Sequence, residues 1–281
     1  MFEAIMEYTF MKNAIWSAVM ASIACGIIGT IIIEKKLVMM SGGIAHTAFG
    51  GVGMGYFLNI EPIFGALFFS ICAALITVTI KRRNDTGTDI IIGLLWSVGM
   101  ALGILFISFT PGYTPDMTSY LFGNILTVTR MDLTIMAALN LIIIITIISL
   151  FNVLKAYMFD EEFTYVMGIN TGLLDYLLLI LIALTIVILI RVAGIILIIA
   201  LLTAPPAIVK KFTHDLKTLM VGSIFVGMIF CVLGLWISYE LNIASGVSII
   251  LLAGFSYLVV SIFSGFKKSS KESMQRANKQ Y

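Results

Sequence analysis

The chain is organised around residues 39–56, which read MMSGGIAHTAFGGVGMGY. These residues lie inside an apolar run long enough to cross a bilayer, yet they are rich in glycine and include a histidine. In a helix, residues four apart lie on one face, and here they form two neighbouring stripes. One stripe contains Gly42, His46 and Gly50, and the other contains Gly43, Thr47, Gly51 and Gly55. Because small residues at this spacing let helices approach closely in lipid, the pattern predicts a groove with tight helix packing.

His46 is the ionisable residue of this groove. An ionisable side chain that faced acyl chains would cost a few kcal/mol, so we expect the imidazole to face protein or a water-filled path. Two interpretations are open at this point. The imidazole either hydrogen-bonds to a neighbouring helix as part of the packing, or it lies on a transport path.

Composition places the chain in the membrane. The mean hydropathy is +1.09 and only 11% of the residues are charged, with the apolar residues in blocks of about twenty. We therefore expect an all-α polytopic membrane protein with about nine transmembrane helices, eight being possible. The expected spans are 14–33, 37–58, 63–80, 90–109, 133–154, 173–190, 192–209, 219–239 and 247–266. The sixth and seventh are separated by almost no loop, so they form either a tight hairpin or a pair with one re-entrant member.

Orientation follows from the basic residues, which collect in loops on one side of the expected spans. This bias predicts a multi-pass plasma-membrane protein with its amino terminus outside and its carboxyl terminus in the cytoplasm. The division is an extracellular segment 1–13, a transmembrane domain 14–266 and a cytoplasmic tail 267–281. Arg191 is expected to snorkel to the outer interface. The three cysteines fall in apolar runs, which argues against a disulfide framework or a thiolate metal cluster.

The cytoplasmic loop 155–170 is acidic and amphipathic, unlike the other, basic loops. Asp160 or Asn152 is suited to cap a short helix there, and Gly168 is suited to end it. In that helix an apolar face is expected from Phe159, Phe163, Val166 and Met167. Such a face fits a groove on a partner or the lipid headgroup layer; the acidic character of the loop favours the partner.

Several motifs resemble, in consistent order from residue 13 to 266, the permease subunits of ATP-binding-cassette importers for zinc, manganese or iron, the ABC-3 type. They are EKKLVMMS at 34–41, DIIIG at 89–93, LFGNIL at 121–126, FDEEF at 159–163, VAGIILIIALLTAPPA at 192–207 and ASGVSI at 244–249. Each motif alone is weak evidence for the resemblance, but six motifs in the family's order are strong evidence. The resemblance implies a fold similar to type II ABC importers.

The resemblance also implies a function: a homodimeric permease that moves a divalent transition metal ion into the cytoplasm. An extracellular metal-binding protein would deliver the metal, and a separate ATP-binding subunit would hydrolyse ATP, so this chain is not expected to be an enzyme, to bind a stable cofactor or to bind nucleic acid. The sequence contains no G-x-x-x-x-G-K-[ST] phosphate loop, in agreement with that division. The family's coupling segment, which docks into the ATP-binding subunit, corresponds to Phe159, Asp160, Glu161, Glu162, Phe163, Val166, Met167 and Gly168.

One position departs from the family pattern. His46 matches the family histidine thought to hold the metal in transit, but Gly42 stands where an aspartate is usual. A carboxylate and an imidazole four residues apart can share a divalent cation, and glycine supplies neither ligand nor charge. A transient site would then borrow ligands from other residues, with Ser41, Thr47, Met39 and Met54 as local candidates. Alternatively, the permease holds metal loosely, or its substrate is not a bare divalent cation.

Two other classes of protein compete with this interpretation. A stand-alone ion-coupled secondary transporter could use His46, Asp89 or Asp175 as a proton relay, although no convincing internal repeat is present. A membrane-embedded zinc hydrolase would need more ligands than His46, because His214 falls in a basic loop. The acidic residues Glu61, Asp116 and Glu240 on the outer side either attract a cation or a binding protein, or are ordinary solvated loop residues.

Overall fold

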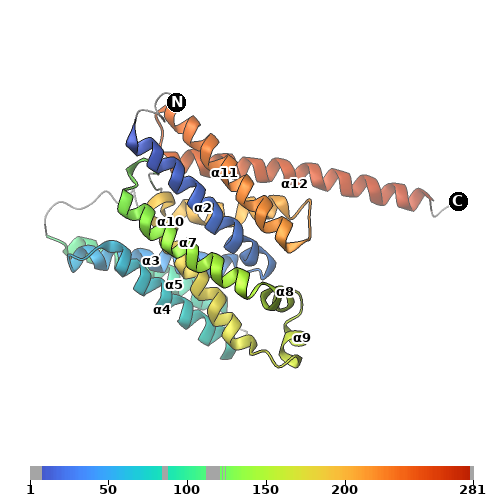
Figure 1. Cartoon of the computed structure of the whole chain (residues 1–281), viewed down its shortest axis with the longest axis horizontal. Helices are drawn as coiled ribbons and strands as arrows, with labels where there is room; N and C mark the ends of the chain where they lie inside the picture. The colour runs from blue at the N-terminus through green and yellow to red at the C-terminus, as the bar shows by residue number, and fades with distance from the viewer. Residues whose placement is uncertain (1–7, 84–87, 112–120, 122, 124, 279–281) are drawn as a thin grey trace.

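A computed structural model describes residues 8–83, 88–111, 121, 123 and 125–278, with side chains for these residues except 191–193 and 265–278. All regular secondary structure in these residues is helical (Figure 1). The helices are α2 (Thr9–Glu34), α3 (Val38–Phe57), α4 (Pro62–Arg83), α5 (Thr88–Phe109), the 3-10 turn η2 (Ile125–Thr127), α7 (Arg130–Ser149), α8 (Phe151–Phe159), α9 (Glu161–Val166), α10 (Thr171–Val209), α11 (Leu216–Leu241) and α12 (Ser245–Asn278). The all-α class predicted from the sequence is confirmed; the expected segment 1–13 lies mostly outside the described residues.

Seven helices in the described part of the chain are long and apolar enough to cross a membrane. The predicted count of nine is therefore not confirmed. The two remaining expected spans correspond to α3 and to the second part of α10, Gly194–Val209, a shorter apolar helix. The glycines and polar residues of α3 make it less hydrophobic than its neighbours, and most of its residues are buried by other helices instead of facing lipid.

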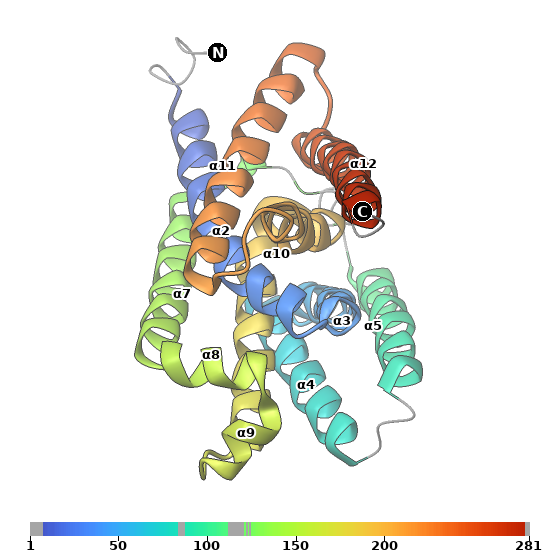
Figure 2. The ribbon, with the colours of Figure 1, turned by 90° about the vertical axis from the view of Figure 1, so that its right-hand side faces the viewer.

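α10 contains both the sixth and seventh expected spans and has no loop between them. Its backbone leaves helical geometry at Gly194, where φ is 67° and ψ is 164°. That combination is essentially restricted to glycine, because a Cβ would clash with the backbone. The two arms of α10 run in different directions, and the second is seen nearly end-on in Figure 2. The glycine break, and not a hairpin loop, separates the two apolar runs.

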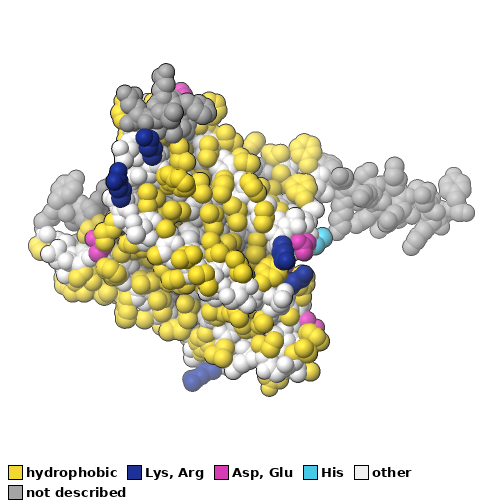
Figure 3. Space-filling model, viewed as in Figure 1, with side chains coloured by type: hydrophobic (Ala, Val, Ile, Leu, Met, Phe, Trp, Pro, Cys, Tyr) yellow, Lys and Arg dark blue, Asp and Glu magenta, His cyan; other side chains and the backbone are white. Residues whose placement is uncertain are grey.

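α2 and α10 lie at the centre of the bundle. α2 packs against α10 and α11, and α3 packs against α4, α5 and α10. The surface of the bundle is apolar: in Figure 3 hydrophobic side chains cover the middle of the visible face, and charged side chains lie near its margins. This distribution fits a molecule whose solvent is largely lipid. At one end α8 and α9 project from the bundle (Figure 2).

Candidate functional site

α3 approaches α4 and α5 so closely that several of its glycines have no room for a side chain. A Cβ built on Gly51 would overlap the carbonyl oxygen of Gly65 on α4, and one built on Gly53 would lie 2.5 Å from the carbonyl oxygen of Gly103 on α5. The glycines Gly43, Gly50 and Gly55 are similarly crowded, against Ile92, Gly99 and Pro62. Contact between helix backbones therefore holds α3 in place.

His46 lies in the α3–α5 interface, where only 7% of its surface is exposed. Its ring stacks on the indole of Trp96 from α5, with ring centroids 4.0 Å apart and an angle of 15° between the planes. The imidazole Nδ1 is buried and has no hydrogen-bond partner among the described residues. His46 therefore packs against the face of an aromatic ring. The sequence does not indicate this contact, because a tryptophan in an apolar helix is usually a packing residue.

Gly42 lies one turn before His46 and faces the same tryptophan. A Cβ built on Gly42 would lie 3.4 Å from Cζ3 of Trp96 and 3.6 Å from Cδ1 of Ile199, which is ordinary van der Waals contact. A methyl group fits at this position, with the indole of Trp96 as its nearest neighbour. Trp96 thus packs against both His46 and Gly42, the position at which the motif resemblance leads us to expect an aspartate.

Among the other local ligand candidates, two hydroxyl groups are hydrogen-bonded to backbone carbonyls and one methionine is exposed. The hydroxyl of Thr47 is 2.8 Å from the carbonyl oxygen of Gly43 and 3.0 Å from that of Leu95, so it connects α3 to α5. The Ser41 hydroxyl donates to the Val38 carbonyl, and Met39 is exposed. No group of three or more histidine, cysteine, aspartate or glutamate residues that could hold a metal is present in the described part of the chain.

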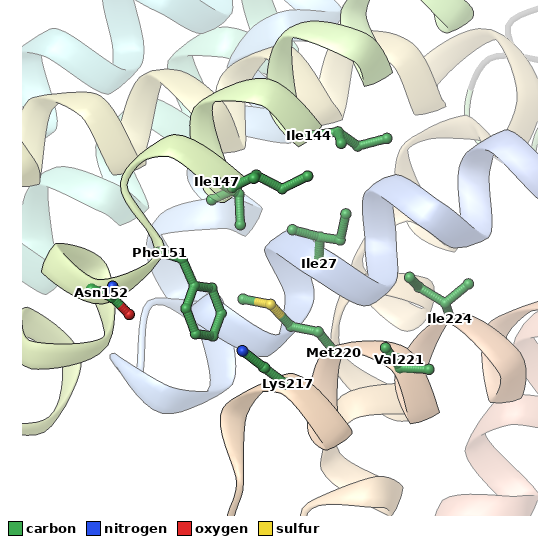
Figure 4. A pocket seen from close by; sticks show the side chains of 10 residues that line it. Ile27, Ile144, Ile147, Phe151, Asn152, Lys217, Met220, Val221 and Ile224 are labelled. Carbon is green, nitrogen blue, oxygen red and sulfur yellow. The ribbon is translucent and has the colours of Figure 1, made fainter.

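Among the described residues, two surface crevices are well defined, and His46 is not among the residues that line these two. One, of about 560 Å³, lies between α2, α7, α8 and α11 and is shown in Figure 4. The other, of about 190 Å³, is bounded by α3, α4 and α5 and includes Thr47. His46 is thus separated from both crevices and is covered by the indole of Trp96.

A cluster of charged and polar side chains surrounds Asp175 in the first turns of α10. Its carboxylate accepts a hydrogen bond of 2.6 Å from the hydroxyl of Tyr157 on α8 and lies 3.3 Å from both Lys81 Nζ and Arg82 Nη1 on α4. Tyr157 is fully buried. Burial, and then the hydrogen bond to Asp175, raise the pKa of Tyr157 well above its usual value near 10. With a hydrogen bond and two ion pairs to Asp175, this cluster gives no support to a proton relay there; Asp89 is exposed at the start of α5.

Lys35, in the turn between α2 and α3, reaches the same region from the other side. Its Nζ lies 2.9 Å from Oε2 of Glu161 at the start of α9 and 3.4 Å from the carbonyl oxygen of Tyr157. The same ammonium lies 3.7 Å from the centroid of the Tyr157 ring, a cation–π contact. No sequence pattern indicates these contacts, because Lys35 and Glu161 are 126 residues apart.

The predicted coupling segment contains α9. Asp160 caps this helix by accepting a hydrogen bond of 2.8 Å from the backbone N–H of Phe163. Gly168 follows with a φ of 81° and gives the left-handed turn expected after a helix. The side chains of Phe159, Phe163, Val166 and Met167 are all more than half exposed. An apolar surface is therefore presented on a short helix that projects from the bundle (Figure 2).

The remaining candidates are solvent-facing or outside the described residues. Glu61 and Glu240 are exposed near helix ends. Asp116 and the side chain of Arg191 lie outside the described part of the chain. The expected roles of these residues stay predictions.

The helical bundle and its apolar surface define a multi-pass membrane protein, and comparison with known proteins gives its family. The sequence model of the ABC 3 transport family matches residues 7–264. The chain therefore belongs to that family, as the resemblance of its motifs predicted.

Individual relatives match along nearly the whole chain. A manganese transport system membrane protein of Listeria monocytogenes is 32% identical over 265 residues, covering 93% of each sequence. An uncharacterized membrane protein of Synechocystis is 40% identical over 258 residues, covering 92% of each. Among solved structures, PsaBC from Streptococcus pneumoniae in complex with Fab matches with a TM-score of 0.84 and 32% identity, over 92% of this chain and 93% of that one.

Proposed function

We propose that this chain is the permease subunit of an ATP-driven importer that carries a divalent transition metal ion, zinc, manganese or iron, into the cytoplasm. The observation that carries the proposal is the family match over residues 7–264. The relative from Listeria monocytogenes is named a manganese transport protein, so manganese is the first metal to test.

The proposed assembly has two copies of this chain, a separate ATP-binding subunit and an extracellular metal-binding protein. Support for the ATP-binding partner comes from α9, whose apolar side chains Phe159, Phe163, Val166 and Met167 are exposed. Amphipathic helices of this kind bind by placing their apolar side chains in a groove of the partner. Asp160, Glu161, Glu162 and Gly168 complete the proposed coupling segment, by capping the helix, supplying charge at its start and ending it.

We place the transient metal contact at His46. A buried imidazole nitrogen without a hydrogen-bond partner supports this role, because a neutral imidazole nitrogen is a good ligand for first-row divalent metals. Opening the contact requires the indole of Trp96 to move off the histidine ring. With Gly42 in place of a carboxylate, the metal is held by few protein ligands and passes quickly.

Reconstitution in liposomes tests the proposal. Purified chain alone should show neither ATP hydrolysis nor uptake of manganese, zinc or iron, and the chain with its ATP-binding subunit and binding protein should accumulate one of these metals when ATP is present. Uptake by the chain alone under a proton gradient would instead identify a secondary transporter. No ATP-dependent uptake of any of the three metals by the complete assembly would refute the proposal.

A further inference from the structure

The contacts of Lys35 and Tyr157 connect the projecting helix α9 to the helices of the bundle. Lys35 makes three contacts with one ammonium: the carboxylate of Glu161, the carbonyl oxygen of Tyr157 and the Tyr157 ring. An isolated ion pair as exposed as Glu161 contributes little to stability. Three contacts together, with the Lys35 side chain only 12% exposed, fix the position of the turn between α2 and α3 relative to α9.

That turn is short and conformationally fixed. α2 ends at Glu34 and α3 begins at Val38, and Lys36 between them adopts a left-handed φ of 57°. From Val38 to His46 the chain is one continuous helix, about 12 Å long at 1.5 Å per residue. A displacement of Lys35 is therefore delivered to the first turn of the helix that carries His46.

The second connection runs through Tyr157. Its hydroxyl donates to Asp175 on α10, and Lys81 and Arg82 hold the same carboxylate from α4. Asp175 lies in the first turns of the arm of α10 that ends at the Gly194 break. Side-chain contacts therefore connect α8 and α9 to α10 as well as to the turn before α3.

We propose that Lys35, Tyr157, Glu161 and Asp175 form a coupling linkage that transmits motion of α9 to α3 and α10. The inference rests on the proposed function, in which α9 receives motion from the ATP-binding subunit. These four side chains are positioning residues. They contact no substrate, and their role is to make the movement of α9 inseparable from that of the helix bearing His46.

The test measures metal transported per ATP hydrolysed by the complete assembly in proteoliposomes. Lys35→Met and Tyr157→Phe should leave ATP hydrolysis within twofold of the wild type. They should lower the amount of metal transported per ATP roughly tenfold, a size typical of the coupling between two sites. The double variant Lys35→Glu/Glu161→Lys restores opposite charges but not the two contacts with Tyr157, so it should recover part of the ratio lost in Lys35→Glu. Lys211→Met removes an exposed lysine of the loop after α10 and is the matched control.

The outcomes separate the two proposals. An unchanged ratio in Lys35→Met and Tyr157→Phe, with an active wild type, would overturn the linkage and leave the proposed function intact. Loss of ATP hydrolysis together with transport in these variants would show that they only support docking of the partner, which also overturns the linkage. Absence of transport by the wild type would count against the proposed function and the linkage together.

The larger of the two crevices is a trough between α2, α7, α8 and α11. Figure 4 shows isoleucine side chains along it, with Lys217 and Phe151 at one end. The smaller crevice beside Thr47 has no charged lining residue. An apolar trough that ends in an amine matches the shape and chemistry of an acyl chain attached to an anionic headgroup.

The charge at that end of the trough is positive. Lys217 Nζ lies 5.2 Å from the Phe151 ring centroid and forms no salt bridge with any side chain in the described part of the chain. The nearby Asp215 carboxylate accepts hydrogen bonds from the backbone N–H and the hydroxyl of Thr218, and these bonds hold its pKa below the usual value. Lys217 also acts on Asp215 electrostatically and helps to lower that pKa, but the two side chains form no ion pair, so the Lys217 ammonium can approach a phosphate.

We infer that this trough binds one anionic phospholipid, with an acyl chain along the isoleucines and the headgroup phosphate at Lys217. Native mass spectrometry of the purified chain in micelles containing equal phosphatidylglycerol and phosphatidylcholine should show one retained phosphatidylglycerol. Lys217→Gln should reduce that retention at least fivefold, and Val221→Trp, which fills the trough, should abolish it. Lys211→Gln should leave it unchanged. Equal retention of the two lipids, or equal effects of Lys217→Gln and Lys211→Gln, would overturn the site.

Discussion

Two buried polar groups of this protein have opposite surroundings. The imidazole Nδ1 of His46 has no hydrogen-bond partner in the described structure and is covered by an aromatic ring. The carboxylate of Asp175, equally buried, has a hydroxyl, an ammonium and a guanidinium around it. A charge must be paired when it is buried, whereas a neutral imidazole is left unpaired at a smaller cost. The Asp175 carboxylate is thus held by partners on α4 and α8, whereas the His46 nitrogen has the free lone pair that the proposed metal contact needs.

The largest effect on stability is expected from removing the Asp175 carboxylate. Asp175→Ala leaves Lys81, Arg82 and the Tyr157 hydroxyl without their shared acceptor. Removing one partner of a buried ion pair costs about 3 kcal/mol or more, reduced here because the two basic side chains are partly exposed. Thermal unfolding of the purified chain in detergent measures the loss. A midpoint equal to that of the wild type would mean that the cluster does not hold α8 and α10 together.

The stability of the fold should be sensitive to added side-chain volume where α3 packs against α4. Gly51→Ala places a methyl group on the carbonyl of Gly65 and should destabilise the fold by about 2 kcal/mol, typical of overpacking. Gly42→Ala is the matched control, because its Cβ meets only ordinary contacts. The difference between their unfolding midpoints checks the packing. Equal midpoints would show that α3 and α4 separate easily, contrary to the backbone contact seen here.

Adding a carboxylate beside His46 tests whether a metal can reach this imidazole. In the double variant Gly42→Asp/Trp96→Ala, a carboxylate and the His46 imidazole share one face of α3 with the indole removed. Manganese should bind at least tenfold more tightly than to Trp96→Ala alone, a gain of about 1.4 kcal/mol. Electron paramagnetic resonance of free manganese measures the affinity. The same affinity in both variants would indicate that His46 does not face a space that a metal can enter.

The smallest effect is expected at high pH. The raised pKa of Tyr157 means that its neutral form is favoured in the folded state. Its contribution to stability is complete below the unfolded pKa of about 10 and declines as pH rises above that value toward the folded pKa. Unfolding midpoints between pH 9 and 11 should therefore fall more steeply for the wild type than for Tyr157→Phe. Parallel curves would mean that the phenol is not protected by burial and Asp175.

Local features of this fold were predictable from sequence, and distant contacts were not. The apolar runs, the capping by Asp160 and the turn at Gly168 follow from residue types within a few positions of one another. The break at Gly194 looked like a possible hairpin, because a sequence pattern does not distinguish a glycine kink from a very short loop.

The candidate site was predicted only in part for the same reason. The motifs located His46 and the segment that contains α9, but nothing near His46 in sequence identifies Trp96, which comes from another helix. The sequence presents Asp175 only as a candidate proton relay, because its partners Tyr157 and Lys81 are 18 and 94 positions away. Side-chain pairing between helices depends on their packing, which hydrophobic periodicity does not specify.

In the proposed function, His46 lies on the path of a transported metal. Metal accumulation tests this role in cells that express the chain with its ATP-binding subunit and binding protein, comparing wild type, His46→Ala and the matched control His214→Ala for manganese, zinc and iron. Membrane levels of each variant are measured in parallel. We predict that His46→Ala loses uptake of the one metal the wild type accumulates, whereas His214→Ala retains it. Full uptake by His46→Ala at a normal membrane level would contradict the claim and leave His46 a packing residue beneath Trp96.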